Sequence, residues 1–389
     1  MNNFTFQNST KLLFGRDAEK NVGEQILPYG SRVLFVNYGD DFILNSPVYA
    51  RVSQSLKDAG LTVFELQGIR PNPLLSKVRE GIALCKREHI DFVLALGGGS
   101  VIDTAKSIGL GATCDWDVWE HYTREHVIRT TLPVGVVLTI PATGSETSAG
   151  SVITNDETHV KLLGSNGKTR PVFAIMNPEV TYTVPRTPMV AGGVDMMSHV
   201  MERYFTPTTH TELTDRLCEA TLKTIIHNLP LTLADPKDYN SRSEIVFSGT
   251  LAHNGLLDCG RTPDWACHFI SHILGGYTNL SHGFTLSILT PHWMRYVYRE
   301  NLDRFVQFAM NVWDIPYCPG NPEQTALEGI AALEGFFRSL GAPLTLAEAG
   351  IRLENPEEIA RLVVQDGPVG NLKKLDAHDV QAILESSAE

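Results

Sequence analysis

The sequence lacks the patterns that would assign it to a secreted, membrane-spanning or disulfide-rich class. Its six cysteines are scattered and form no Cys-x-x-Cys pair, which favours reduced thiols over a disulfide framework or a cysteine-based zinc site. The opening residues "MNNFTFQNSTKLLFG" hold no basic stretch followed by an apolar one, so no secretory signal is predicted. No run of about 18 apolar residues occurs, so no membrane span is expected. We therefore expect a cytoplasmic location.

Positive charge is also scarce. The chain has 32 Lys and Arg against 44 Asp and Glu, a formal net charge of −12. This balance argues against nucleic acid or an anionic membrane as the main partner. With 389 residues, of which 43% are hydrophobic, the chain is too long for one ordinary core. One large domain or two medium domains are expected.

The periodicity of apolar residues changes near residue 180. Before that point, short β-branched or aliphatic runs such as 31–39 and 91–97 alternate with helix-like segments, which predicts an α/β domain with a mainly parallel sheet. Beyond residue 185, helical spacing prevails and strand candidates nearly vanish. We therefore predict an α/β domain over residues 1–184 and an all-helical domain over residues 185–389, joined near the proline-marked segment "NPEVTYTVPRTP".

Two polar loops follow apolar strands in the first half. In "LALGGGSVIDTAKSIG" (94–109), a strand runs through three glycines into a helix start, where backbone N–H groups and the helix dipole favour a phosphate. A plain tight turn is the alternative, because neither GxGxxG nor a P-loop is present. The second loop, "TIPATGSETSAG" (139–150), offers several hydroxyl groups to a ligand, or is simply a solvated loop.

Carboxylate and imidazole groups gather in the second half. Asp195 and His199 are four apart on a predicted helix, so they share one face. The stretch "ACHFISHILGGYTNLSHG" adds His268, His272 and His282. Three histidines and a carboxylate suit a divalent transition metal, whereas the alternative is a hydrogen-bonded core pair. Spacing leaves open whether His268 or His272 is the third nitrogen ligand.

The histidines of this stretch can meet only if the chain turns. A straight helix from His268 to His282 would separate them by about 21 Å. We expect the break at Gly275, Gly276 and Asn279. The spacing "HFISH" resembles that of zinc proteases but lacks their glutamate, which argues against a metalloprotease.

The ordered set of motifs resembles the metal-dependent ("iron-containing") alcohol dehydrogenase family, in its butanol-dehydrogenase and broad aldehyde-reductase branch. The motifs are "STKLLFGRDA", "PNP", "GGGSVIDTAK", "PATGSETS", "GGVDMMSHVMERYF" and "DWACHFISHILGG" with the later "SHG". The resemblance implies a dinucleotide-binding domain and a helical metal-binding domain, as in the dehydroquinate synthase-like architecture, with the active site in the cleft between them. It also implies hydride transfer between a nicotinamide cofactor and an aldehyde or primary alcohol.

The resemblance assigns roles to particular positions. It carries the metal onto Asp195, His199, His268 and His282, and it makes His272 a candidate proton relay or a support for the metal ligands. The residues that match cofactor-binding positions are Tyr38, Gly39, Asn72, Gly97, Gly98, Gly99, Ser100, Asp103, Thr139, Thr143, Ser145 and Lys161.

The expected cofactor depends on the charges near the ribose position, and the expected metal on the type of its ligands. The stretch "VNYGDDF" follows the first predicted strand, and the resemblance makes Tyr38 and Gly39 the position that selects the ribose, with Asp40 and Asp41 directly after it. Two carboxylates would repel a 2′-phosphate, which favours NAD(H) over NADP(H). The metal is expected to be Fe²⁺ or Zn²⁺. The family resemblance suggests a homo-oligomer, most simply a dimer.

The substrate hypothesis rests on Arg261, just before the metal-binding stretch. An arginine there would bind the far end of a short anionic aldehyde, such as sulfoacetaldehyde or a semialdehyde. A structural ion pair is the alternative. A same-fold lyase or polyol dehydrogenase would need several basic residues, and only Arg203 and Arg261 lie near the proposed ligands in sequence. A metal-dependent hydrolase would leave the glycine-rich turn unexplained.

Overall fold

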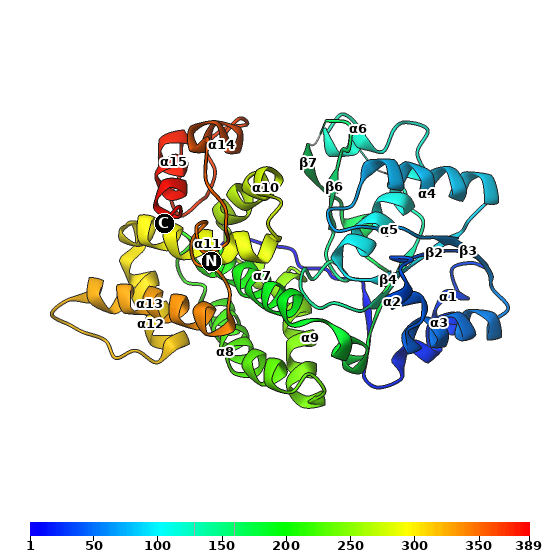
Figure 1. Cartoon of the computed structure of the whole chain (residues 1–389), viewed down its shortest axis with the longest axis horizontal. Helices are drawn as coiled ribbons and strands as arrows, with labels where there is room; N and C mark the ends of the chain where they lie inside the picture. Colours follow the sequence, from blue (N-terminus) through cyan, green and yellow to red (C-terminus); the bar gives the residue numbers. More distant parts are fainter. Residues whose placement is uncertain (128, 159) are drawn as a thin grey trace. The chain divides into compact units, whose positions relative to one another are not determined.

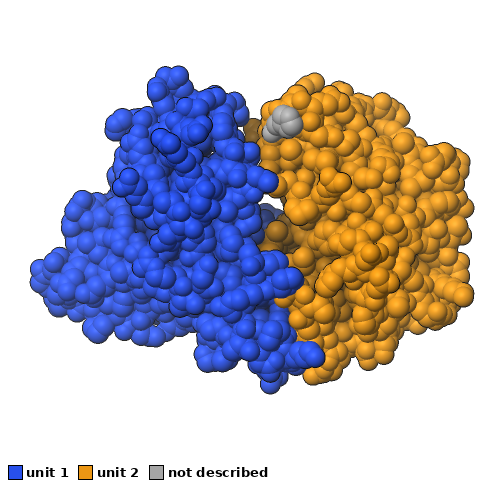
Figure 2. Space-filling view, in the orientation of Figure 1, with its two compact units in different colours: residues 1–6, 185–389 blue, residues 7–184 orange. Residues whose placement is uncertain are grey.

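The computed structural model describes residues 1–127, 129–158 and 160–389, and the chain divides into two compact units (Figures 1 and 2). One unit is Gln7–Val184, and the other combines Met1–Phe6 with Pro185–Glu389. The first six residues, which the sequence pattern grouped with the α/β domain, belong to the helical unit. Hydrogen bonds explain this, because the Asn2 N–H donates to Gly260 O at 2.8 Å and the Asn2 amide donates to Thr262 Oγ1 at 3.1 Å.

Unit Gln7–Val184 is built on a parallel sheet of six strands in the order β1-β8-β5-β4-β2-β3. The strands of this sheet are β1 (Lys11–Phe14), β2 (Arg32–Val36), β3 (Thr62–Leu66), β4 (Phe92–Gly97), β5 (Val134–Leu138) and β8 (Phe173–Met176). The predicted α/β domain with a mainly parallel sheet is confirmed. An antiparallel pair, β6 (Gly150–Thr154) and β7 (Lys161–Ser165), was not foreseen.

The strand order reverses between β2 and β4. β3 lies on one side of β2, whereas β4, β5 and β8 continue on the other side, so the carboxyl ends of β2 and β4 flank the position where α/β sheets bind ligands. Helices α4 and α5 cover one face of the sheet, and α1 and α3 cover the other (Figure 1). The helices of this unit are α1 (Val22–Ile26), α2 (Asp41–Leu44), α3 (Pro47–Asp58), α4 (Leu75–Glu88), α5 (Gly99–Gly111) and α6 (Trp119–Tyr122).

The other unit is helical, as expected, and α7 lies at its centre. Every residue of α7 from Met189 to Tyr204 is buried, and α8, α9 and α11 pack against this helix. The helices are α7 (Arg186–Tyr204), α8 (Glu212–Ala234), α9 (Tyr239–His253), α10 (Ala266–Thr278), α11 (His282–Val297), α12 (Leu302–Trp313), α13 (Pro322–Leu340), α14 (Pro356–Val363) and α15 (Ala377–Ser386). No helix in the described ranges is long and apolar enough to cross a membrane.

Of the three residues expected to break the histidine-rich stretch, only Asn279 does so. Gly275 and Gly276 are helical residues of α10, so the prediction that they turn the chain is wrong. The helix ends instead at Asn279, whose φ of 54° is the left-handed conformation that asparagine tolerates at a helix end, and whose N–H donates to Gly275 O. α11 then begins at His282, which allows this residue to face back towards α10.

Candidate active site

One face of α7 carries a series of polar side chains. Asp195, His199 and Glu202 follow one another at intervals of four and three residues, so their side chains lie on the same side of the helix. All three are buried, with exposed fractions of 6% or less. Buried ionisable groups are costly unless they are paired or bind an ion, so this face requires partners.

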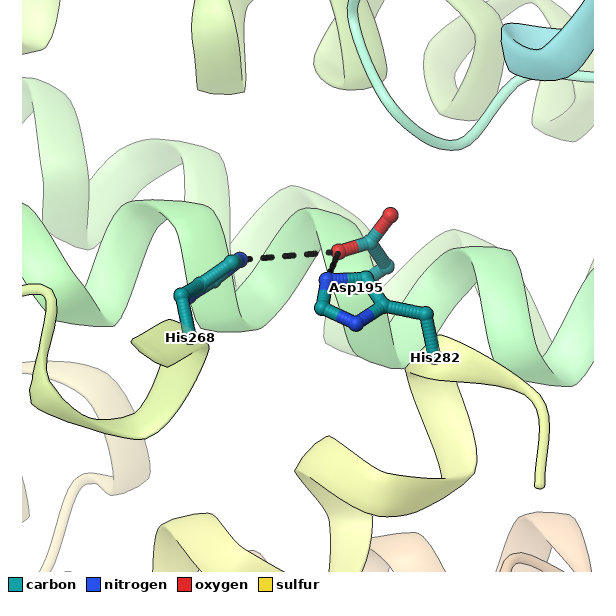
Figure 3. A group of neighbouring side chains, drawn as sticks. All are labelled: Asp195, His268 and His282. Atoms are coloured by element: carbon teal, nitrogen blue, oxygen red, sulfur yellow. Dashed lines mark ion pairs between the residues drawn. The ribbon is translucent and has the colours of Figure 1, made fainter. Parts of the chain in front are cut away.

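Those partners are histidines, and they surround a single carboxylate oxygen. The Nε2 atoms of His199, His268 and His282 lie 3.7, 3.8 and 3.6 Å from Asp195 Oδ1. His268 comes from α10 and His282 from the first residue of α11, and Figure 3 shows both rings directed towards Asp195. Ligand atoms of Asp195, His268 and His282 all lie within 4.8 Å of one another.

The distances fit a shared ion better than direct hydrogen bonds. An N–H···O hydrogen bond spans about 2.7–3.2 Å, which is shorter than all three separations. Two atoms that each bind one ion at about 2.1 Å with tetrahedral geometry are about 3.4 Å apart. In the described chain, the buried His268 Nε2 has no hydrogen-bond partner. The nitrogen and oxygen donors therefore suit a divalent metal such as Fe²⁺ or Zn²⁺.

The opposite ring nitrogen of His268 is held by a carboxylate. Glu202 Oε1 lies 3.0 Å from His268 Nδ1, and the same oxygen accepts the backbone N–H of His268 at 2.9 Å. A carboxylate can only accept here, so Nδ1 carries the proton and Nε2 presents its lone pair towards Asp195. The sequence reasoning missed Glu202, although its position seven residues after Asp195 on the same helix face was a usable signal.

Two hydroxyl groups fix the tautomer of His282 in a similar way. Thr285 donates its only hydroxyl hydrogen to His282 O at 2.7 Å, so Ser271 must be the donor in its short hydrogen bond to Thr285. Ser271 Oγ therefore accepts from His282 Nδ1, 2.9 Å away. The Nε2 atom of His282 is left as a lone-pair donor, as metal binding requires.

The charge environment differs between the histidines. Burial, reinforced by His253, His268 and Arg203, holds the pKa of His199 well below its usual value, which favours the neutral ring. Burial also acts to lower the pKa of His268, but Asp195 and Glu202 outweigh it and the net shift is upward. Burial therefore decides the direction of the shift for His199, and the two carboxylates decide it for His268.

A second layer of aromatic and cationic groups encloses the histidines. Trp265 has a φ of 68°, a strained conformation for a bulky residue, and its ring lies 5.1 Å from that of His268. The Arg203 guanidinium lies 4.6 Å from the Trp265 ring and 2.9 Å from Asp258, and its N–H points to His253 Nδ1 at 3.2 Å. The His253 ring is 4.3 Å from that of His199. None of these contacts was predicted from the sequence.

His272 lies beside the cluster but outside the group around Asp195 Oδ1. Its ring centroid is 5.1 Å from that of His282 and 6.4 Å from that of His268. The side chain is partly exposed, whereas His268 is buried. Of the two alternatives that spacing left open, His268 is the one whose nitrogen is directed at Asp195.

Arg261 does not have the substrate-facing role that we expected. Its side chain has no exposed surface and is 2.8 Å from Asp215. The same guanidinium donates to Arg203 O at 2.9 Å and to Thr214 Oγ1 at 2.5 Å. The structural ion pair, which we considered as the alternative, accounts for these contacts. The substrate-anchoring hypothesis for this residue is therefore corrected.

The glycine-rich turn of the other unit lies where β4 passes into α5. Gly97 ends β4, Gly98 precedes the helix, and Gly99 and Ser100 are its first residues. A Cβ at Gly99 would lie 2.7 Å from the Thr143 side chain, so only glycine allows this approach of the second polar loop. Thr139 joins the same region through its N–H, which donates to Gly97 O at 3.0 Å.

Asp103 and Ser145 form a buried network with Lys106. Ser145 Oγ donates to Asp103 Oδ1 at 2.5 Å, and the Val152 N–H donates to the other Asp103 oxygen at 2.9 Å. Lys106 Nζ donates to Ser145 Oγ at 2.8 Å, and burial lowers the pKa of Lys106 to about 8. Burial likewise raises the pKa of Asp103. These contacts hold the second polar loop against α5.

Two further residues from the predicted cofactor set also meet. Lys161 Nζ donates to Asn72 Oδ1 at 3.0 Å, which joins β7 to the loop after β3. Asn72 has a φ of 56°, a left-handed conformation that asparagine adopts more readily than most residues. Tyr38 also meets Gly98, because the Gly98 N–H donates to the Tyr38 hydroxyl at 3.1 Å.

Comparison with known families assigns both units. Residues 9–178 match the model described as iron-containing alcohol dehydrogenase, and residues 189–388 match the C-terminal model of the Fe-containing alcohol dehydrogenase family. The chain is 44% identical to a probable NADH-dependent butanol dehydrogenase of Bacillus subtilis, with 100% of both chains covered. It is 35% identical to the NADPH-dependent aldehyde reductase YqhD of Escherichia coli, with 90% of each covered.

A solved structure agrees with this assignment. The crystal structure of NADH-dependent butanol dehydrogenase A from Thermotoga maritima matches with a TM-score of 0.95 and 36% identity, over 100% of this chain and 99% of that one. Asp195, His268 and His282 form a group that could hold the metal named in the family's description. The chain therefore belongs to the iron-containing alcohol dehydrogenase family and is an oxidoreductase of alcohols and aldehydes.

Proposed function

We propose that this alcohol dehydrogenase holds a divalent metal with four side chains and transfers hydride between NAD(H) and an uncharged short-chain aldehyde or primary alcohol. The proposed ligands are Asp195, His199, His268 and His282. The observation that carries the proposal is the arrangement of three Nε2 atoms at 3.6–3.8 Å around Asp195 Oδ1.

The roles of the side chains follow from their protonation. A divalent ion bound here would act as a Lewis acid that polarises the substrate oxygen, and the nicotinamide would carry the hydride. Glu202 and Ser271 keep the Nε2 atoms of His268 and His282 unprotonated, so both rings can serve as neutral ligands. We propose His272 as the group that passes a proton between the substrate oxygen and water, supported by its partial exposure and by its ring centroid, 5.1 Å from that of His282.

The start of α5 supports a dinucleotide. The first N–H groups of a helix have no partner within it, and here Val101 and Ile102 both donate to Gly98 O. The N–H groups of Gly99 and Ser100 thus remain to bind a pyrophosphate. The carboxylates of Asp40 and Asp41 after β2 favour NAD(H), because a 2′-phosphate near them would be repelled.

The substrate is proposed to be uncharged because the nearby cations are already engaged. Arg261 is paired with Asp215, and Arg203 contacts Asp258, His253 and the Trp265 ring. Neither guanidinium therefore supports an anionic aldehyde such as sulfoacetaldehyde or a semialdehyde. The same contacts weigh against a lyase or polyol-phosphate dehydrogenase, which would need cations to hold a phosphate.

A cofactor oxidation assay tests the proposal. The metal-free protein is reloaded with Fe²⁺, Zn²⁺ or Mn²⁺ and mixed with NADH or NADPH and a series of neutral and anionic aldehydes, while the absorbance of the reduced nicotinamide is followed. We expect metal-dependent oxidation of NADH with short neutral aldehydes, and loss of both metal and activity in Asp195→Ala. The absence of metal-dependent oxidation of either cofactor would refute the proposal.

The homodimer also stands as a proposal for this chain. It is supported by β1, an edge strand of the sheet, on which Leu12 and Phe14 have exposed fractions of 39% and 42%. Edge strands with exposed apolar side chains favour association with another chain. Light scattering of the purified protein should give twice the chain mass, and Leu12→Lys should shift the mass towards that of one chain. A single-chain mass for the unmodified protein would contradict the dimer.

A further inference from the structure

The ring of His199 is positioned differently from those of the other two proposed histidine ligands. A carboxylate holds His268 Nδ1, and a hydroxyl group holds His282 Nδ1. Among residues 1–127, 129–158 and 160–389, no hydrogen-bond partner reaches the buried His199 Nδ1. The rotation of this imidazole must therefore be set by the side chains that pack against it.

The His199 ring lies among other rings. The His253 centroid is 4.3 Å from that of His199, with an interplanar angle of 41°, and the His268 ring is stacked at 4.7 Å and 20°. The Trp265 ring meets His199 edge-on at 6.2 Å. Glu202 already holds His268 in place. The positions of His253 and Trp265 therefore decide how the remaining sides of the His199 ring are supported.

Arg203 contacts both of these supporting rings. Its Cζ lies 4.6 Å from the centroid of the Trp265 ring, and one terminal nitrogen donates to His253 Nδ1 at 3.2 Å, because arginine can only donate. The other terminal nitrogen donates to His199 O at 2.7 Å, which ties the guanidinium to the helical turn that carries His199. Asp258 Oδ1 lies 2.9 Å from Arg203 Nε and balances the charge.

A guanidinium is an unfavourable neighbour for a metal cation. The Arg203 side chain has an exposed fraction of only 3%, so its charge is removed from water at a cost. Its positive charge also repels a divalent ion, and this repulsion is screened less in a buried site than in water. The contribution of Arg203 to the metal site therefore lies in the rings that it holds.

We propose that Arg203 is a positioning residue for the metal site. It fixes the rings of His253 and Trp265, and these two rings fix the rotation of His199, so that His199 Nε2 is directed towards Asp195. The proposal rests on the proposed metal site, in which His199 is a ligand, and adds the residue that orients this ligand. Arg203 acts through the two rings and does not itself bind the metal.

Metal titration of the full-length, metal-free protein tests the proposal independently of turnover. Competition for Zn²⁺ with a chromophoric chelator gives the dissociation constant, and the visible absorption of the Co²⁺-loaded protein reports the geometry of the ligands. The variants are Arg203→Met, His253→Ala and the double variant, and thermal melting checks that each of them folds. Arg304→Met is the matched control, because Arg304 is also buried, lies 2.7 Å from Asp215 and has its Cζ 5.3 Å from the centroid of the Tyr204 ring.

We expect Arg203→Met and His253→Ala each to raise the Zn²⁺ dissociation constant by about tenfold or more, and to change the Co²⁺ spectrum. The double variant should bind Zn²⁺ about as weakly as the weaker single variant, because both substitutions release the same ring. Arg304→Met should lower the melting temperature without changing the dissociation constant. By charge alone, removal of a guanidinium would tighten cation binding, so the sign of the change separates positioning from electrostatics.

The titrations distinguish a failure of the metal site from a failure of the role of Arg203. If the unmodified protein binds neither Zn²⁺ nor Co²⁺, the proposed metal site fails. If it binds them but Arg203→Met binds Zn²⁺ equally well or more tightly, the positioning role is refuted. The role is also refuted if the effects of Arg203→Met and His253→Ala multiply in the double variant, or if Arg304→Met weakens Zn²⁺ binding as much as Arg203→Met does.

Discussion

A single oxygen, Glu202 Oε1, accepts two hydrogen bonds from His268, one from its backbone N–H and one from its ring Nδ1. The two bonds fix both the start of α10 and the rotation of the imidazole. The second oxygen, Oε2, is buried and has no hydrogen-bond partner in the described part of the chain. Glu202 therefore places a carboxylate directly behind His268, the proposed metal ligand, where it would make the ring a more basic donor.

Replacing Glu202 with glutamine should weaken metal binding. The Glu202→Gln variant keeps an acceptor for the His268 N–H groups but removes the charge, so the metal dissociation constant should rise by about 10- to 100-fold. Competition with a chromophoric chelator measures this constant. Glu219→Gln is the matched control, because Glu219 is also buried and accepts from Tyr204, Gln307 and Asn311. Equal metal affinity in both variants would contradict the role of Glu202.

Substitution of two neighbouring histidines should separate metal binding from proton transfer. His268→Ala removes a proposed ligand and should abolish stoichiometric metal binding. His272→Ala should retain the metal, and its turnover should fall by about 10²-fold or more with a changed pH profile. Metal analysis and kcat against pH provide the measurements. Loss of metal from His272→Ala, or its retention in His268→Ala, would reverse the assignment of the two residues.

Arg261 should matter for stability and not for substrate choice. Arg261→Met removes one of the two arginines paired with the buried Asp215 and leaves Arg304, 2.7 Å away, so the free energy of unfolding should fall by about 3 kcal/mol. The ratio of kcat/KM for anionic and neutral aldehydes should not change. Arg216→Met, which breaks an exposed pair with Glu212, should cost less than about 1 kcal/mol. A tenfold change in the ratio for Arg261→Met would restore the substrate-facing hypothesis.

Asp264 should make stability fall as the pH rises. Burial, followed by the charge of Glu202, raises the pKa of Asp264 to about 6 in the folded protein. The folded state therefore binds this proton more tightly than the unfolded chain, and the associated stability is lost as the pH rises through about 6. Relative to Asp264→Asn, the free energy of unfolding should fall by about 1 kcal/mol between about pH 5 and 7. Urea unfolding of both proteins at each pH measures these free energies. A difference between the two proteins that does not change with pH would contradict the raised pKa of Asp264.

The sequence predicted those parts of the fold that local patterns specify. Strands β2, β4 and β5 are apolar runs buried in the sheet, and their residue types predict both a strand and its burial. β1 has only four residues and is mostly exposed, so its short apolar run was not predicted as a strand. The break was expected at Gly275, Gly276 and Asn279, but α10 continues through both glycines and only Asn279 ends it. A glycine permits a break, and the tertiary contacts decide where the break occurs.

In the candidate site, too, local patterns predicted some features, and tertiary contacts decided the others. The spacing of Asp195 and His199 on one helix face could be read directly from the sequence. The choice between His268 and His272 could not be made from spacing, because it depends on which ring points towards α7. Ser271 and Trp265 contribute through a hydrogen bond and a strained backbone, and neither leaves a sequence signature. The ion pair of Arg261 could not be predicted from spacing, because its partner Asp215 lies far away in sequence, on α8.

The place of the first residues has a consequence for folding during synthesis. Asn2 is hydrogen-bonded to Gly260 and Thr262, which leave the ribosome more than 200 residues later. The α/β unit, Gln7–Val184, is a continuous segment and can fold while the rest is still being made. Residues 1–6 cannot form these hydrogen bonds until the helical unit has been synthesised. A rapidly folding fusion partner placed before residue 1 should therefore delay or prevent the last step of assembly, whereas the same partner after residue 389 should not.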